Sequence, residues 1–367
     1  MITHEFPPFT GGMATYAADL AAAVSATGIE VTVLAPAYER ETNETRFEVI
    51  RILRHQRLGP GSAAKLLARL LATPNDAFWH GVDIRSTLIL HTAHLLTGRP
   101  YGATIHGSEA AKLGGKGLRV KSARAGYRRA AVVFANSHAT ARVASAQISH
   151  RELRIAHLGV RGEWFSTPPA ACTDSRLERF LSAGPCICTV GRLEPRKGHQ
   201  HVLAALRALK ATGVEIGYVI AGPVIDADYR RSLERFVLKT GLRVLFAEST
   251  SNEDLRRLYA TSVCHVLCAR SLRGKTEGFG LVLLEAAAQA CPSIVTRVGG
   301  MPEVVRHEET GLVIEEADLD GLTAGLRNLF ANRSLRDEMG RRAYEHAKTF
   351  TWDACARATY RAILKGY

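Results

Sequence analysis

Two glutamates flank a glycine turn and an apolar run in the stretch TEGFGLVLLE. Glu277 stands before a glycine turn, and Glu285 follows it by eight positions, a little over two turns of a helix. A helix that begins near Phe279 or Gly280 would carry Glu285 and leave Glu277 in the loop before it. The free amides of Gly280 and Leu281 would then favour an anion such as a diphosphate. Carboxylates accept hydrogen bonds from hydroxyl groups, so the residue types indicate a nucleotide sugar.

Two cations follow a predicted buried strand in the stretch GRLEPRKG. Arg192 and Lys197 lie between Gly191 and Gly198, directly after the apolar run 186–190. Ligands of open α/β sheets bind at the carboxyl ends of strands. Two cations in that place would offset the charge of a leaving diphosphate.

Two further features lie in the first half of the chain. Gly11 and Gly12 precede a predicted helix of small residues, so the backbone there could approach a phosphate or a sugar closely. His106 ends the predicted strand 101–105 and is expected at the carboxyl edge of its own sheet. Each of these signals alone is also typical of an ordinary loop or a structural histidine.

Together these motifs resemble one family. The stretch from Glu277 to Glu285, with the glycine turn at 297–301, resembles the signature of the large retaining glycosyltransferase family 4. GRLEPRKG is similar to its Arg and Lys pair, FPPFTGGMATY to its amino-terminal glycine loop, and IHGSE to its histidine motif. The motifs span most of the chain in the expected order, which is more specific than any one of them.

The resemblance implies roles for individual residues. Glu277 would contact the donor sugar and stabilise positive charge at its anomeric carbon, and Glu285 would hold the ribose hydroxyls. His106 would lie near the reaction centre. The donor would be bound without a metal or other cofactor. The remaining donor-binding residues would be Gly12, Arg192, Lys197, Gly278, Phe279, Gly280 and Leu281.

Strand-like and helix-like runs alternate along the 367 residues, which predicts α/β architecture with parallel sheets covered on both faces. The length and a polar segment at 166–184 favour two domains. We expect an amino-terminal, acceptor-binding Rossmann-like domain at 1–168 and a nucleotide-sugar-binding one at 184–349. The resemblance implies the GT-B fold, two doubly wound domains facing a cleft, with residues 350–367 crossing back to the first.

The beginning of the chain departs from the family pattern. The family has a full apolar strand before its FPP segment, whereas only Met1, Ile2 and Thr3 precede His4 here. The first strand is therefore expected to be unusually short, or to begin upstream of Met1.

The net charge of +13 favours an anionic partner. The segment 112–129 is rich in lysine and arginine and contains no acidic residue between Lys112 and Arg129. Its candidates for a contact with the acceptor or a membrane are Lys116, Arg119, Lys121 and Arg124. This segment is either a solvated helix face or a docking surface for anionic lipid or sugar. Nucleic-acid binding is not expected, because no zinc-finger spacing or aromatic-and-basic RNA motif is present.

The cysteines and the apolar runs indicate a cytoplasmic protein. There are seven cysteines, most of them in apolar strand-like runs, which favours reduced thiols over disulfides. Cys264, His265 and Cys268 fall in a buried strand and are not expected to bind metal. No apolar run is long enough to span a membrane, and no signal peptide precedes the first motif.

The sequence therefore predicts a metal-independent, retaining glycosyltransferase of a bacterial cytoplasm. If the basic segment is a docking surface rather than a solvated helix face, the enzyme is peripheral on the inner face of the cell membrane. UDP-sugars are favoured as donors over GDP-sugars. The acceptor is a cell-envelope glycan, a lipid-linked sugar or a small molecule, and the linkage and oligomeric state stay open. The alternatives are a nucleotide-sugar epimerase of the same fold and a basic module that binds nucleic acid or membrane.

Overall fold

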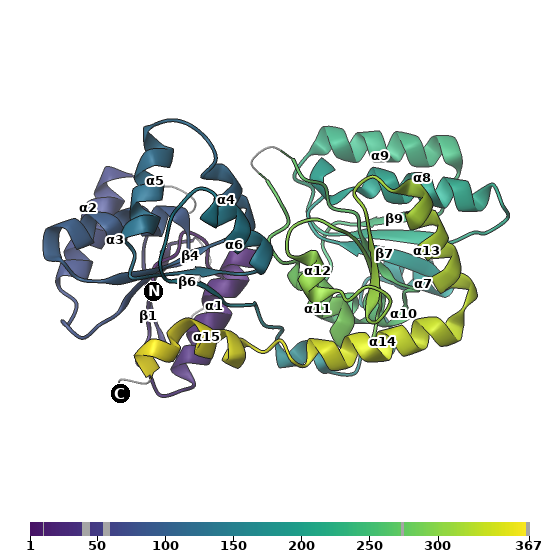
Figure 1. The fold of residues 1–367 in the computed structure, drawn as a ribbon. Coiled ribbons are helices and arrows are strands. Elements are labelled where there is room, and N and C mark those ends of the chain that lie inside the picture. Colours follow the sequence, from purple (N-terminus) through teal and green to yellow (C-terminus); the bar gives the residue numbers. More distant parts are fainter. Residues whose placement is uncertain (10, 39–44, 54–58, 273–274, 365–367) are drawn as a thin grey trace. The chain divides into compact units, whose positions relative to one another are not determined.

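The computed structural model describes residues 1–9, 11–38, 45–53, 59–272 and 275–364. The chain forms two compact units, shown in Figure 1. The first unit comprises Met1–Gly159, Arg273–Gly278 and Thr351–Tyr367, and the second Val160–Leu272 and Phe279–Phe350. The domains expected from the sequence, 1–168 and 184–349, were defined as parts that fold independently. These boundaries therefore stay a prediction.

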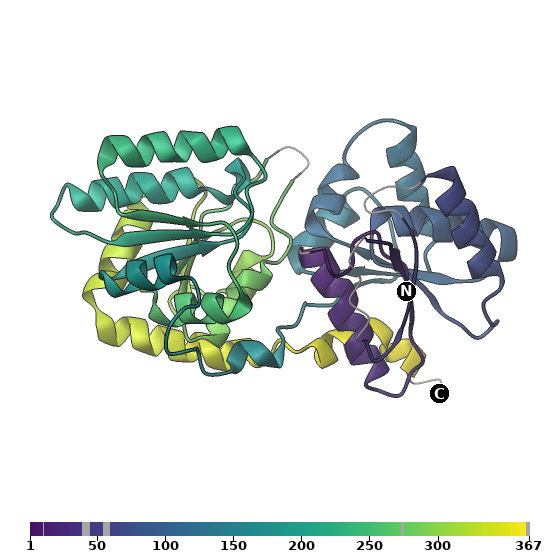
Figure 2. The ribbon, with the colours of Figure 1, turned by 180° about the vertical axis from the view of Figure 1, so that it is seen from behind.

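The first unit is a parallel sheet between helices. Its strands are β1 (Thr32–Pro36), β2 (Glu48–Leu53), β3 (Trp79–Gly81), β4 (Tyr101–Ile105), β5 (Val132–Ala135) and β6 (Leu153–Ile155). Its helices are α1 (Gly12–Ser25), α2 (Pro60–Leu71), α3 (Ile84–Thr97), α4 (Gly107–Lys112), α5 (Leu118–Arg129), α6 (His138–Ser145) and α15 (Trp352–Leu364). Helices α2, α3 and α5 pack side by side, and α1 packs on α15, as Figure 2 shows in purple and yellow. The helix expected to return to the first unit is therefore α15.

A very short strand at Ile2 joins this sheet together. Ile2 pairs in parallel with Leu34 of β1 on one side and with Gly81 of β3 on the other. The order becomes β2, β1, Ile2, β3, β4, β5, β6. The first strand of the described chain is therefore short, and the side chain of Ile2 in it is buried.

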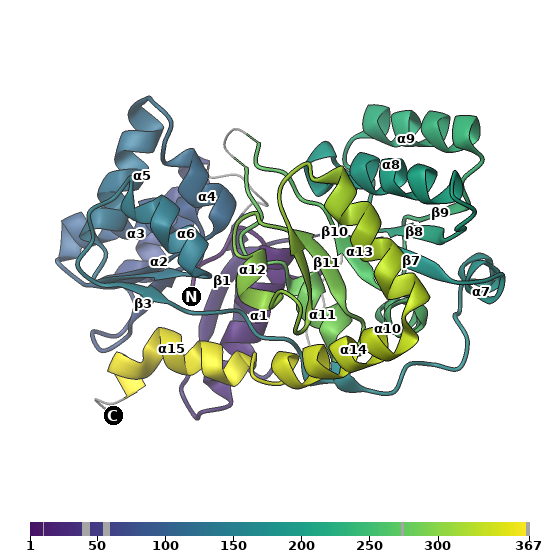
Figure 3. The same ribbon diagram turned by 45° about the vertical axis from the view of Figure 1, so that its right-hand side comes forward.

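The second unit repeats this architecture with six parallel strands in the order β12, β11, β10, β7, β8, β9. The strands are β7 (Cys186–Val190), β8 (Gly217–Ala221), β9 (Val244–Ala247), β10 (His265–Leu267), β11 (Ser293–Thr296) and β12 (Gly311–Ile314). The helices are α7 (Ser175–Ser182), α8 (His199–Lys210), α9 (Ala227–Thr240), α10 (Asn252–Thr261), α11 (Leu281–Ala288), α12 (Met301–Val304), α13 (Leu319–Ala331) and α14 (Arg333–Ala347). In Figure 3, α8 and α9 lie on one side of the sheet and α10, α11 and α14 on the other. All five residues of β7 and of β8 are buried, as strands covered on both faces require.

The doubly wound α/β prediction is confirmed, and the polar segment 166–184 between the two expected domains is partly helical. It contains α7, capped by the Asp174 carboxylate, which accepts from the amides of Arg176 and Leu177. The buried carboxylate of Asp254 holds the residues before this helix, because it accepts from the amide and hydroxyl of Thr173 at 2.6 and 2.7 Å. The polar composition that suggested a linker is that of a capped surface helix.

Candidate active site

Helix α11 begins one residue after the predicted position. Gly280 precedes it with φ of 88°, a left-handed conformation that favours glycine, and Leu281 is the first helical residue. Phe279 is fully buried and lies edge-on to Phe350, with ring centroids 5.9 Å apart. These contacts fix the turn, so the first amides of α11 are left at the end of the helix for a ligand or solvent.

Glu285 lies on the second turn of α11 and is half-buried. Burial raises the pKa of its carboxyl to about 7, an effect that the nearby Arg161 opposes and Glu163 adds to. The hydroxyl of Tyr259 donates to its Oε2 at 3.4 Å. Glu285 is therefore a partly desolvated acceptor whose charge changes near neutral pH.

The two predicted cations lie in the loop after β7. The guanidinium of Arg192 is 3.2 Å from Glu194 and its side chain is half-exposed, whereas Lys197 is buried. A Cβ at Gly198 would collide with the carbonyl oxygen of Cys268, so glycine is required there and the loop lies directly against the end of β10. Burial, and then the charge of Lys197, lowers the pKa of His265 to about 3, so this neighbour stays neutral.

Strands β7 and β10 form the switch point of the second sheet. They are neighbours, and the chain continues from β7 to β8 and β9 on one side, and from β10 to β11 and β12 on the other. Ligands of doubly wound sheets bind outside the carboxyl ends of the strands at such a point. The loop after β7 carries the two cations, and the segment after β10 leads to α11.

His106 follows β4 in the first unit and is held as a neutral imidazole. Its Nε2 donates to the carbonyl of Val82 at 3.1 Å, so the lone pair is on Nδ1. Burial lowers the pKa of His106 to about 4, although the Val82 bond and the charge of Asp83 act in the opposite direction. The ring of Tyr16 meets the imidazole edge-on at 5.1 Å. His106 can therefore accept a hydrogen bond at neutral pH.

Within the first unit, the structure brings the IHGSE motif together with the first three residues of TEGFG, Thr276 to Gly278. A Cβ at Gly107 would lie 2.6 Å from the Cα of Gly278, and the hydroxyl of Ser108 donates to the carbonyl of Thr276 at 3.2 Å. Glu277, half-buried, stands between Thr276 and Gly278. The sequence predicted both motifs but not their contact.

The glycine loop is held by an arginine that sequence reasoning missed. Arg51 of β2 donates to the carbonyls of Pro7 at 3.0 Å and Pro36 at 2.9 Å, and its guanidinium lies 5.7 Å from the centre of the Phe6 ring. Nothing lies within 4 Å of a Cβ built on Gly12. Packing within the protein therefore does not require glycine at that position. No local signal marks Arg51, because it stands in an ordinary strand pattern.

The basic segment divides into exposed and structural residues. Lys116, Arg119 and Lys121 are exposed at the start of α5, beside Leu118, whose side chain is 80% exposed. Arg124 differs from the expectation, because it is half-buried and its Nε donates to the carbonyl of Leu113 at 2.8 Å. Arg124 thus holds the turn between α4 and α5. Among the described residues, no helix is long and apolar enough to cross a membrane.

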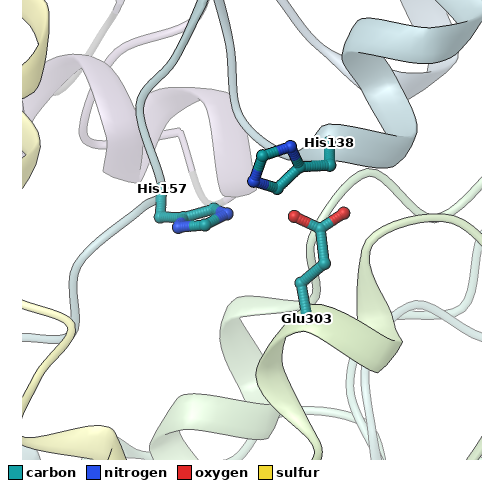
Figure 4. Close-up of side chains that lie close together, drawn as sticks. All are labelled: His138, His157 and Glu303. Carbon is teal, nitrogen blue, oxygen red and sulfur yellow. The ribbon is translucent and has the colours of Figure 1, made fainter.

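Two histidines that the sequence did not single out also lie at this edge of the first sheet. His138 begins α6 after β5, and His157 follows β6, with their rings edge-on and 5.7 Å apart (Figure 4). Glu303, drawn in the same figure, belongs to α12 of the second unit. The histidine pair fastens the loop after β6 to the start of α6.

Two family models match the chain, one after the other. The model of glycosyltransferase family 4 matches residues 10–163, and that of glycosyl transferases group 1 matches residues 178–346. A mannosyltransferase of Mycobacterium tuberculosis, named GDP-mannose-dependent alpha-(1-6)-phosphatidylinositol monomannoside mannosyltransferase, is 27% identical over 97% of this chain and 95% of its own. A protein of Corynebacterium glutamicum, named GDP-mannose-dependent monoacylated alpha-(1-6)-phosphatidylinositol monomannoside mannosyltransferase, is also 27% identical. The match covers 96% of this chain and 94% of that protein.

Solved structures show the same fold. Sucrose-phosphate synthase from Thermosynechococcus elongatus superimposes with a TM-score of 0.82 at 21% identity, covering 100% of this chain and 98% of its own. HepE of Anabaena, solved in complex with UDP and glucose, gives a TM-score of 0.80 at 17% identity, covering 99% and 98%. With both family models matched in order and the GT-B architecture present, the chain belongs to glycosyltransferase family 4 and is a retaining glycosyltransferase.

Proposed function

We propose that this enzyme transfers a hexose from a nucleotide-diphosphate sugar to a lipid-linked or glycan acceptor without a metal ion. The observation that carries the proposal is the set of groups at the switch point of the second sheet. Arg192 and Lys197 follow β7, and the amino terminus of α11 follows β10 with Glu285 on its second turn. Cations and free amides bind a diphosphate, and a carboxylate binds ribose hydroxyls.

In this proposal, the cations replace the divalent ion that many phosphoryl-handling sites use. Arg192 and Lys197 offset the charge that develops on the leaving diphosphate, and the amides of Gly280 and Leu281 bind its oxygens. The buried environment of Lys197 strengthens its interaction with an anion, because the local dielectric is lower than in water.

His106 and Glu277 are the residues that we assign to the transferred sugar. His106 carries a lone pair on Nδ1, so it accepts a hydrogen bond from a hydroxyl of the sugar or the acceptor. Glu277 faces the positive charge that develops at the anomeric carbon. The two carboxylates are not an acid and nucleophile pair, since Glu285 binds the nucleotide.

GDP-mannose is the donor that we place first. The relatives matched over nearly the whole chain carry GDP-mannose in their names, whereas the HepE structures hold UDP with glucose or UDP-glucose. This reverses the order predicted from the sequence, in which UDP-sugars came before GDP-sugars.

A donor screen tests the proposed function. We expect GDP or UDP to raise the unfolding temperature in the presence of EDTA, because binding to the folded state alone stabilises it. Release of nucleotide from the matching sugar donor should require an acceptor. Consumption of donor without acceptor would favour the epimerase, and salt-dependent DNA binding with no nucleotide effect would favour the basic binding module.

We also propose that the exposed start of α5 contacts an anionic membrane. Lys116, Arg119 and Lys121 surround the exposed Leu118, and each basic residue near such a surface contributes about 1 kcal/mol. The acceptors named for the long relatives are phosphatidylinositol mannosides, which are lipids.

Charge reversal tests this contact. Changing Lys116, Arg119 and Lys121 to glutamate should abolish sedimentation with phosphatidylinositol vesicles. A matched triple reversal on α9, at Arg231, Arg235 and Lys239 beside the exposed Leu238, should leave it intact. Equal losses in both variants would refute a localised contact.

We predict that Glu285→Gln weakens nucleotide binding without unfolding the protein. Loss of a hydrogen bond to a charged group costs about 1.5–3 kcal/mol, roughly a 10- to 100-fold rise in Kd. With a pKa of about 7, the ionised fraction rises from about a tenth at pH 6 to about nine-tenths at pH 8. The affinity of the wild type should therefore rise over this range more steeply than that of Glu285→Gln.

Calorimetric titration with GDP and UDP at both pH values measures this difference. Comparing the two proteins removes the contribution of the phosphate groups of the nucleotide, which titrate in the same range. Parallel pH dependences would exclude Glu285 from the nucleotide site.

A further inference from the structure

Glu109 joins two loops at the carboxyl edge of the first sheet. It lies on the first turn of α4, and its side chain is almost completely buried. Its Oε1 accepts from the amide of Ile84 at 2.8 Å, and its Oε2 from the amide of His106 at 3.3 Å. One carboxyl group thus connects the loop after β3 to the loop that carries His106.

A second carboxyl group shares the same helix start. Asp83 caps α3 by accepting from the amides of Arg85 at 2.9 Å and Ser86 at 2.8 Å, directly beside the Ile84 amide that Glu109 takes. Asp83 also accepts from the backbone of His4 at 2.7 Å, and its Oδ1 lies 3.2 Å from the imidazole Nδ1 of that residue. Two buried carboxyl groups therefore lie at one helix amino terminus.

The surroundings of the two carboxyl groups shift their pKa values in opposite directions. Burial acts to raise the pKa of Asp83, but the hydrogen bonds and charge of His4 outweigh it and lower the value to about 2. Burial, and then the charge of Asp83, raises the pKa of Glu109 to about 8, and these two effects outweigh the opposing hydrogen bonds from the amides of Ile84 and His106 and the charge of Lys112.

Two further groups face Glu109, and neither carries a positive charge at neutral pH. They are His106, which is neutral, and the phenol of Tyr127 on α5, whose pKa is raised by burial and then by the charge of Glu109. At neutral pH, one carboxyl is ionised and the other holds a proton.

We propose that Glu109 is a positioning residue that fixes His106 by tying its loop to the start of α3, and that ionisation of Glu109 loosens this tie. A second buried carboxylate beside Asp83 is costly, because the two charges repel each other and both lose solvation. The strain is relieved when the Glu109 carboxylate turns toward solvent, which breaks its bonds to the amides of Ile84 and His106. This inference rests on the role of His106 in the proposed function.

The dependence of thermal stability on pH tests the tie without a sugar-transfer assay. The folded state keeps a proton on Glu109 between pH ~4.5 and ~8, where the unfolded chain has released it. The unfolded state therefore binds fewer protons, and this residue makes stability fall as pH rises through that window. Glu109→Gln cannot ionise, so the Tm of wild type relative to this variant should decline from pH 5 to pH 8. Parallel Tm curves would overturn the proposal.

Kinetics test the consequence for His106. An amide side chain accepts through only one atom, so Glu109→Gln loses one of the two backbone bonds. We expect kcat to fall about tenfold or more with KM for the nucleotide sugar unchanged, measured as nucleotide release from GDP-mannose or UDP-glucose with phosphatidylinositol monomannoside as the acceptor. The alkaline fall of kcat near pH 8 in the wild type should be absent in the variant.

The control is Glu152→Gln, an exposed change on the same unit that should leave both profiles unchanged. A wild-type pH profile in Glu109→Gln would overturn the inference while leaving the proposed function standing. If the wild type releases no nucleotide from either donor in the presence of this acceptor, the proposed transfer fails, and the Tm curves still decide whether Glu109 forms the tie.

Discussion

Replacement of Glu277 by alanine is expected to abolish sugar transfer while the protein stays folded. The residue stands half-buried between Thr276 and Gly278, in the loop that packs on the IHGSE motif. Stabilisation of charge that develops in the transition state is commonly the largest catalytic contribution, and losing one such group costs about 10²–10³ in kcat. We expect a loss at the upper end of that range, because the carboxylate would carry a full charge.

Comparison with Glu285→Gln makes this prediction specific. Glu277→Ala should lower kcat and leave the Kd of the free nucleotide unchanged, whereas Glu285→Gln should raise that Kd. An exposed change on the second unit, Glu308→Ala, controls for loss of negative charge. Full transfer activity in Glu277→Ala would remove the central residue of the proposed mechanism.

Most of the fold could be predicted because buried parallel strands have a strong sequence signal. The runs YGATI and CICTV are apolar and short, and each is completely buried in a sheet covered by helices. The start of α11 was predicted within one residue because glycine before an apolar run marks a helix start. Helix α7 was missed, since its polar surface residues have the composition of a linker and only its cap at Asp174 distinguishes it.

The parts of the site that could not be predicted depend on contacts between distant segments. Arg51 holds the glycine loop from another strand, and Glu109 acts through the amide of Ile84. Arg51 has no local pattern that distinguishes it from an ordinary strand residue. Glu109 ends the IHGSE motif, but that motif does not reveal its bond to the distant Ile84. Burial of a polar side chain is what identifies such groups, and burial follows from the tertiary structure.

The contact between Gly107 and Gly278 leads to the second large effect. A Cβ added at Gly107 would lie 2.6 Å from the Cα and 3.1 Å from the amide nitrogen of Gly278, so no flexible side chain can move aside. We expect Gly107→Ala to cost about 1–3 kcal/mol in unfolding free energy, as overpacking does. Because the loops that carry His106 and Glu277 must separate, kcat should fall about 10²-fold, which a displacement of about 1 Å can cause. Urea unfolding and nucleotide release measure the two effects.

A rescue experiment distinguishes this backbone contact from ordinary crowding. A Cβ at Gly278 would meet the amide nitrogen of the Asn136 side chain at 2.9 Å and the Gly107 backbone only at 3.1 Å. Asn136→Ala should therefore partly restore Gly278→Ala, but it should not restore Gly107→Ala, whose nearest obstacle is main chain. Gly61→Ala in α2, where nothing lies within 4 Å, is the matched control and should change stability by less than about 1 kcal/mol. Wild-type activity in Gly107→Ala would mean that the two loops need not touch for transfer, and that His106 and Glu277 act without the alignment this contact imposes.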